Sequence, residues 1–180
     1  MKQEDTLLDF ITGRKIPNIG SEMNRQAVER FLVEEKGFTR EEIRVDTDIS
    51  LDMSGEVYCS QVDLVVRVDE KNVMLIKCCS GSISSHERET LAAARLLDQY
   101  QIPLSVISDG KSAVILDTIS GKKLSEGLET IPSKKEIYAL LKTIVFIPYP
   151  EERKEREKLI FRSYDEMNVN VARKQNRSPL

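Results

Sequence analysis

An aspartate and a lysine stand inside two apolar runs of this sequence. Asp63 lies within Val62–Val66, and Lys77 directly follows Val73–Ile76. A charge in such a run is costly to bury unless it is paired or bound to a metal. The polar segment 69–72 between the runs predicts a β-hairpin, which would place Asp63 almost opposite Lys77. Two interpretations stay open: a cross-strand ion pair, or a retained catalytic site.

The surrounding sequence predicts the elements that position this pair, because apolar residues recur with period two in strands and at helical spacing in helices. In chain order we expect a helix over residues 4–11, a loop to residue 20, a helix over 21–36, a strand over 43–51, the hairpin over 57–79, a helix from 84 to about 101, strands over 104–107 and 113–117, and helices over 133–144 and 151–167. The nearly continuous apolar runs of the hairpin indicate strands that are covered on both faces.

The order of these elements resembles the PD-(D/E)XK nuclease fold. A helix ending in Gly37-Phe38, a strand, the segment QVDLVV, a polar turn, VMLIKCCSG and a further helix follow that layout. Within that superfamily the chain resembles the N-terminal domain family of type I restriction enzyme R subunits, to which VERFLVEEKGFTREEIRVD and IPLSVISDGKSAVILDTISGKKL are also similar. The resemblance covers roughly residues 24–125.

The resemblance implies an α/β, restriction-endonuclease-like fold, a mixed sheet flanked by helices on both faces. We expect residues 21–148 to form this nuclease-like core. Residues 1–20 are expected to form an N-terminal helix and loop, and residues 149–180 a charged C-terminal helix and tail.

The resemblance also assigns roles to the two charged residues. In that family an aspartate and a glutamate hold Mg²⁺, and a lysine two residues after the glutamate helps to activate water. Asp63 matches the aspartate and Lys77 the lysine, which leaves Leu75 at the position of the glutamate. Leucine cannot bind a metal. A shifted register would put Lys77 at the glutamate and Cys79 at the lysine, which is worse, so the motif is incomplete.

Two other carboxylates could replace the missing one, as in restriction enzymes that carry it on the helix after the hairpin. Glu87 stands at the start of that helix, and Glu29 lies on the earlier helix. Each also has a structural interpretation, since Glu87 fits a capping box with Ser84 and Glu29 fits a solvated helix position. With Mg²⁺ as the possible cofactor, the candidate catalytic residues are Asp63, Lys77 and Glu87, and the candidate metal ligands are Asp63, Glu87 and Glu29.

Composition limits the partners and the cellular compartment that we expect for the protein. Its 180 residues carry a net charge of −3, which gives no support to a strongly basic nucleic-acid-binding surface. Three cysteines, with Cys78 and Cys79 adjacent, make a poor disulfide framework and lack zinc-site spacing. The start of the chain is unlike a signal peptide, and no apolar run approaches the ~18–20 residues that span a bilayer. We therefore expect a cytoplasmic protein without a membrane segment.

Three functions stay open. The incomplete motif and the acidic balance favour a non-catalytic module that binds nucleic acid or protein. The second function is a Mg²⁺-dependent endonuclease that uses Asp63, Lys77 and a relocated carboxylate. The third is a homodimeric interaction protein that assembles through its C-terminal helices. Glu87 or Glu29 within shared metal-binding reach of Asp63 would favour the enzyme, whereas a space sealed by Leu75 and Ile76 would oppose it.

Overall fold

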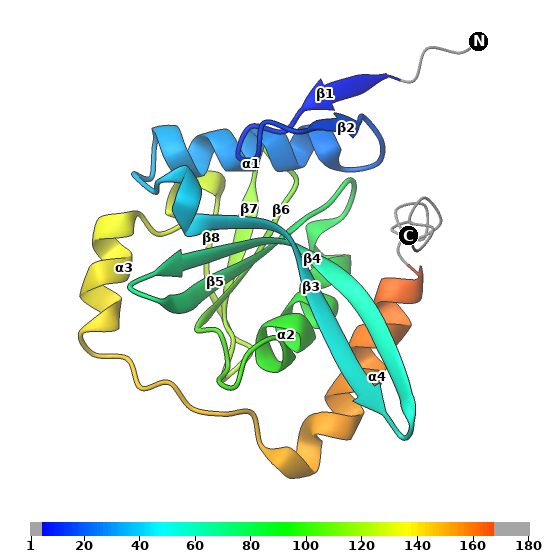
Figure 1. The fold of residues 1–180 in the computed structure, drawn as a ribbon. Coiled ribbons are helices and arrows are strands. Elements are labelled where there is room, and N and C mark those ends of the chain that lie inside the picture. The colour runs from blue at the N-terminus through cyan, green and yellow to red at the C-terminus, as the bar shows by residue number, and fades with distance from the viewer. Residues whose placement is uncertain (1–4, 168–180) are drawn as a thin grey trace.

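The computed structural model describes residues 5–167 of the chain (Figure 1). Its strands are β1 (Thr6–Leu8), β2 (Lys15–Pro17), β3 (Ile43–Met53), β4 (Glu56–Val68), β5 (Lys71–Cys78), β6 (Leu104–Ser108), β7 (Ala113–Asp117) and β8 (Lys123–Glu126). Its α-helices are α1 (Glu22–Glu34), α2 (Glu87–Leu96), α3 (Lys134–Leu141) and α4 (Glu151–Met167), with short 3-10 turns η1 (Arg40–Glu42), η2 (Ile83–His86) and η3 (Leu128–Thr130). The predicted tail beyond Met167 lies outside the described residues.

The larger sheet is mixed, as the sequence predicted. Its order is β3-β4-β5-β6-β7-β8, and every neighbouring pair is antiparallel except β5 and β6, which are parallel. A parallel pair needs a crossover connection, and α2 supplies it. The predicted hairpin over 57–79 is confirmed as β4 and β5, whose turn residues Asp69 and Glu70 both adopt positive φ.

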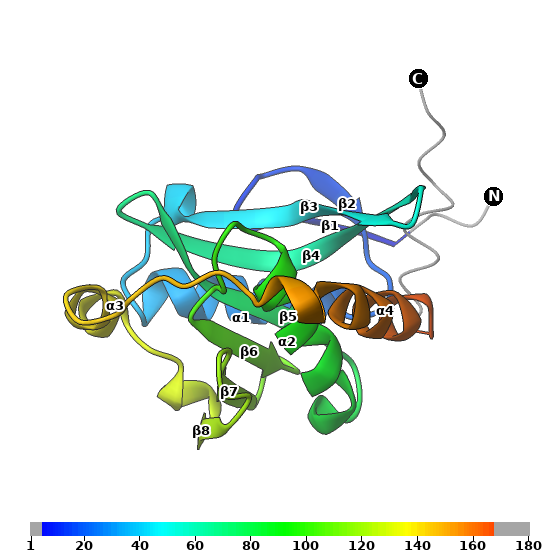
Figure 2. The ribbon, with the colours of Figure 1, turned by 90° about the horizontal axis from the view of Figure 1, so that it is seen from below.

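Helices cover both faces of this sheet, which confirms the predicted α/β class. On β4 and β5, Leu64 and Ile76 pack in one core with α1 and α3, whereas Val65 and Leu75 pack in another with α2 and α4. Successive strand residues point to opposite faces, so the alternation distributes the hairpin between the two cores. Figure 2 shows α3 and α4 at opposite sides of the molecule.

The predicted helix over residues 4–11 is wrong, because β1 and β2 form a small antiparallel hairpin there. Leu7, Leu8 and Ile11 have helical spacing, but Asp9 turns the chain. Its Oδ1 accepts hydrogen bonds from the backbone N–H and the hydroxyl of Thr12, at 2.7 and 2.8 Å. Such an aspartate turn competes with helix formation locally.

Side-chain caps are present at some helix termini and absent at others. A capping box closes η1, with the Thr39 backbone N–H donating to Glu42 Oε2 at 2.9 Å. The predicted cap of Ser84 is wrong, since Ser84 lies inside η2 and α2 begins at Glu87 without a side-chain cap. No helix among residues 5–167 is long and apolar enough to cross a membrane.

Candidate functional site

The site lies where β4 and β5 separate. The two strands pair from Val68 opposite Lys71 to Leu64 opposite Ile76. Asp63 and Lys77 come directly after this last pair. The carboxylate of Asp63 occupies the fork, where its Oδ2 accepts the backbone N–H of Cys78 at 2.8 Å. This bond replaces a ladder hydrogen bond and fixes the carboxylate between the strands.

Strand β3 is also irregular at this level. Its pairing with β4 joins Val45 to Leu64 and Thr47 to Val62, but it skips Asp46, which adopts a φ of +52°. Residues with positive φ are rare outside glycine and interrupt a regular ladder. The candidate site is therefore built at an irregular point of an otherwise continuous sheet.

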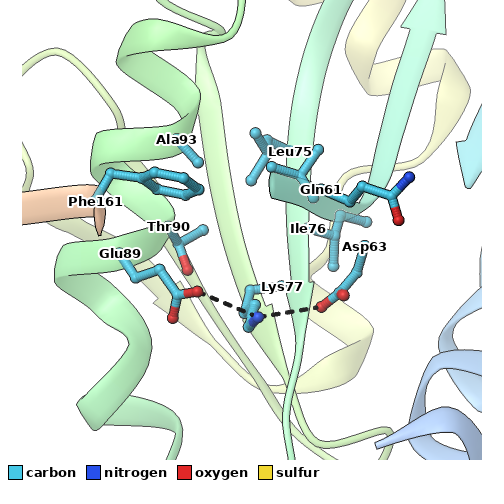
Figure 3. A pocket seen from close by; sticks show the side chains of 10 residues that line it. Gln61, Asp63, Leu75, Ile76, Lys77, Glu89, Thr90, Ala93 and Phe161 are labelled. Carbon is cyan, nitrogen blue, oxygen red and sulfur yellow. Dashed lines mark ion pairs between the residues drawn. The ribbon is translucent and has the colours of Figure 1, made fainter. Parts of the chain in front are cut away.

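Lys77 lies between two carboxylates. Its Nζ is 3.8 Å from Asp63 Oδ2 on β4 and 3.3 Å from Glu89 Oε1 on α2, as Figure 3 shows. The three residues are 8%, 2% and 3% exposed, respectively. The predicted pairing of Asp63 with Lys77 is thus confirmed, and Glu89 is a third member that the sequence analysis missed. We call these three residues the buried triad.

The environment of the lysine keeps it charged. Burial alone would lower the pKa of Lys77, but the carboxylates of Asp63 and Glu89 outweigh it, so the pKa lies above its usual value. Asp165 of α4 acts in the same direction at longer range. Glu89 is itself held on its far side, since its Oε2 lies 3.3 Å from His86 Nδ1. The buried triad therefore carries two carboxylates around one ammonium ion.

Apolar side chains close the space beside the triad. The cavity there measures about 10 Å³ and is lined by Leu75, Ile76, Ala93 and Phe161 as well as by the triad. That is room for roughly one water molecule. Phe161 reaches the cavity from α4 and is 2% exposed. Leu75 and Phe161 therefore narrow this space from the side of α2 and α4, whereas most of Ile76 packs in the core beneath α1.

Glu29 lies on α1, which packs on the other face of the hairpin. The expectation of a solvated residue is wrong, since Glu29 is 0% exposed and its Oε1 lies 2.9 Å from Arg25 Nη1. Asp9 and Glu22 contact the same guanidinium at 2.8 and 2.6 Å. Burial raises the pKa of Glu29 to about 7, although Arg25 opposes the shift. Glu29 therefore belongs to a separate buried cluster around Arg25.

Glu87 also stays outside the cavity of the triad. It is the first residue of α2 and lines a different cleft, together with Arg88 and Arg95. Glu89 occupies the place that we had considered for Glu87. The helical spacing could have pointed to Glu89, because this residue precedes the buried Ala93 by four residues and so lies on the same face of the helix.

The two cysteines of the fork face opposite sides of the sheet. Cys78 packs in the core beneath α1, and Cys79 packs with Leu91 and Ile107. Burial raises the pKa of both thiols, that of Cys79 to about 11. Both are thus kept as neutral thiols near neutral pH, which does not suit a nucleophile or a metal ligand.

The residues of the fork fit an ammonium ion better than Mg²⁺. Residues 5–167 contain no group of three or more histidine, cysteine, aspartate or glutamate side chains placed to share a metal ion. Mg²⁺ requires near-octahedral oxygen ligands and usually keeps several waters. Leu75 supplies no oxygen at the remaining strand position, and Lys77 already places a positive charge between Asp63 and Glu89.

The chain matches the model of a known protein family. The family model for the type I restriction enzyme R protein N terminus covers residues 20–132. The chain belongs to this family. No match was found among curated proteins or among solved structures. Both strands of the fork and α2 lie inside the matched range, whereas α4, which brings Phe161 over the cavity, lies beyond it.

Membership of the type I restriction enzyme R family agrees with the resemblance that QVDLVV and VMLIKCCSG predicted. Leu75 stands at the position where that resemblance implies a glutamate. Leu75 is 1% exposed and packs in the core with Ala93 and Phe161. A carboxylate at this strand position would have to enter that apolar core, where burial of its charge is costly.

Proposed function

We propose that this domain is a non-catalytic binding module that retains a nuclease-like fold. The single observation that carries the proposal is the position of the Lys77 ammonium group between Asp63 and Glu89. An ammonium ion there neutralises the charge that a metal would otherwise have to balance, but it provides no Lewis acid and no bound water of lowered pKa.

A nucleic acid is the partner that we propose first. The family is that of a restriction enzyme subunit, and this is the support for a nucleic-acid partner. In a module of this kind the buried triad acts as a structural clamp. It joins β4, β5 and α2 through one cation, and holds the fork in a fixed geometry without chemical turnover.

The proposal is tested by metal binding and cleavage together. We expect no saturable binding of Mg²⁺ or Mn²⁺ by calorimetry, and no cleavage of single- or double-stranded DNA in the presence of either ion. The assays are run on wild type, Asp63→Ala and Glu89→Gln. Glu87→Gln is the matched control, because it removes a carboxylate from the same helix outside the cavity of the triad.

Metal-dependent cleavage that Asp63→Ala and Glu89→Gln abolish, and that Glu87→Gln retains, would overturn the proposal. It would establish a Mg²⁺-dependent nuclease in which Glu89 replaces the missing strand glutamate. Loss of cleavage in Glu87→Gln as well would restore Glu87 as the relocated carboxylate.

The partner is tested separately by fluorescence anisotropy with labelled single- and double-stranded oligonucleotides. We expect binding that weakens as the salt concentration rises. Absence of binding to every oligonucleotide would contradict the choice of nucleic acid and favour a protein partner. A solution mass of twice 20.5 kDa by light scattering would support the homodimeric alternative.

A further inference from the structure

A second and larger cavity lies on another side of α2. It is formed by α2, the first turns of α4 and the turn between β7 and β8, and its volume is about 630 Å³. Binding sites for small ligands commonly measure ~300–1,000 Å³. Four arginines stand in its walls, namely Arg88, Arg95, Arg153 and Arg156. We call it the arginine cleft.

One of these arginines is fixed in the wall. The Nη1 of Arg95 donates to Glu157 Oε1 at 2.7 Å, and its Nε donates to the carbonyl oxygen of Thr118 at 3.0 Å. The second oxygen of Glu157 accepts the hydroxyl of Tyr149 at 3.0 Å. Both oxygens of this buried glutamate are therefore engaged. Arg95 is a preorganised donor, and Glu157 has no free oxygen for the other arginines.

The remaining three arginines are exposed. Arg88, Arg153 and Arg156 form no salt bridge with any residue of the described range 5–167. They project from α2 and from α4, so the cleft receives unpaired guanidinium groups from two elements that are separate in the sequence.

The lysines of α4 behave differently. Lys154 and Lys158 pair with Glu151 and Glu155, one turn earlier on the same helix, at 2.6 Å in each case. The lysine charges of this helix are thus matched locally by its own acids. On this helix Arg153 and Arg156 line the cleft, whereas the paired Lys154, Lys158 and Arg162 do not.

The arginine cleft is positive although the protein is acidic. Four arginines face two glutamates, Glu87 and Glu157, which leaves an excess of two positive charges in a chain of net charge −3. A concave surface of one sign raises the local concentration of ligands of the opposite sign. Guanidinium groups match the oxygens of phosphate with paired hydrogen bonds, which an ammonium group cannot do.

We propose that the arginine cleft binds a phosphate-bearing ligand, with Arg88, Arg153 and Arg156 donating to its phosphate oxygens and Arg95 fixed beneath them. This site goes beyond the proposed function, because the cleft would bind phosphate whether or not the buried triad cleaves anything. A free polyphosphate, such as that of a nucleotide, and the backbone of a nucleic acid offer the same chemistry.

The test compares Arg153→Gln/Arg156→Gln with wild type. The matched control is Lys135→Gln/Lys142→Gln, which removes the same charge from exposed positions at α3, on the opposite side of the molecule (Figure 2). The probes are tripolyphosphate and ATP by calorimetry, and a labelled oligonucleotide by anisotropy. Thermal unfolding followed by circular dichroism verifies that each variant is folded.

We expect wild type to bind at least one probe, the arginine variant to bind it at least tenfold more weakly, and the control to remain within twofold. Arg153→Lys/Arg156→Lys should bind with intermediate affinity, since it keeps charge and loses the paired geometry. Tight binding of tripolyphosphate and ATP identifies a free polyphosphate ligand. Binding of the oligonucleotide alone identifies a nucleic-acid backbone.

Two results would overturn the proposal. The first is an equal loss of affinity in the arginine variant and the lysine control, which would mean a general charge effect. The second is the absence of binding of every probe by folded wild type. Neither result depends on metal binding or cleavage at Asp63, so the non-catalytic role is decided by its own measurements. Oligonucleotide binding that is equal in wild type, the arginine variant and the lysine control would contradict the arginine cleft and leave the nucleic-acid partner standing.

Discussion

Replacing Lys77 by methionine tests whether the buried triad is a structural clamp. The substitution retains most of the side-chain volume and removes the charge, so Asp63 and Glu89 remain buried at 2% and 3% exposure without their cation. Removing one partner of a buried ion pair typically costs ~3–5 kcal/mol. Domains of this size are stable by about 5–15 kcal/mol in total, so the variant should be severely destabilised and still partly measurable.

The measurement is urea denaturation followed by far-UV circular dichroism, because the chain contains no tryptophan. With a denaturant slope of about 2 kcal/mol per molar urea, the loss corresponds to a midpoint lower by roughly 2 M. Lys123→Met is the matched control. Its partner Glu126 and the lysine itself are 62% and 53% exposed, so the loss there should stay below ~1 kcal/mol.

A triple variant separates charge from packing. In Lys77→Met/Asp63→Asn/Glu89→Gln the two carboxylates that lose Lys77 become neutral amides of similar shape. An asparagine oxygen at position 63 can still accept the N–H of Cys78. We expect this variant to recover at least half of the stability that Lys77→Met loses. If Lys77→Met resembles the exposed control, or if the triple variant recovers nothing, the clamp is refuted.

Two further predictions concern other parts of the fold. The pKa of Glu29 is about 7 in the folded protein and near 4.5 in the unfolded chain, so between these values only the folded protein keeps the proton. The free energy of unfolding should therefore fall by ~2–4 kcal/mol as the pH rises from about 4.5 to 7, and then level off. Glu29→Gln should remove this slope between pH 5 and pH 7.5 in urea denaturation, and an unchanged slope would contradict the assignment. Gly110→Ala should cost ~1–3 kcal/mol more than Gly55→Ala. Both residues have positive φ, but only at Gly110 would a new Cβ meet the backbone of Asn24, at 3.1 Å. Equal losses in the two alanine variants would show that this contact relaxes freely.

The sequence predicted the central hairpin because two independent signals agree there. The runs that contain Asp63 and Lys77 are strongly apolar, and the polar segment between them contains Asp69 and Glu70, which both adopt positive φ in the turn. The ion pair follows from this register. In a hairpin, the number of residues from the turn determines which residues lie opposite each other. Asp63 and Lys77 could therefore be placed together without a structure.

The parts that were not predicted depend on contacts between distant segments. Glu89 joins the triad because α2 crosses over the sheet with a particular rotation, and this helix begins at Glu87 rather than at the expected residue 84. Phe161 lines the cavity from the charged C-terminal helix, and the charge pattern of that helix does not indicate which sheet face it covers. In the N-terminal segment, the side-chain bonds of Asp9 to Thr12 outweighed the helical spacing of the leucines.

The strand order has a consequence for how the chain acquires its structure. In the six-stranded sheet each strand lies beside its predecessor in the sequence, so pairing can proceed stepwise from β3 to β8, with a long connection only at the crossover through α2. Helix α4 is different, since the Tyr58 hydroxyl bonds Asp165 across 107 residues of chain. During synthesis from the N-terminus, the sheet can therefore assemble before α4 exists, and the fork around Lys77 stays open to solvent until this last helix docks.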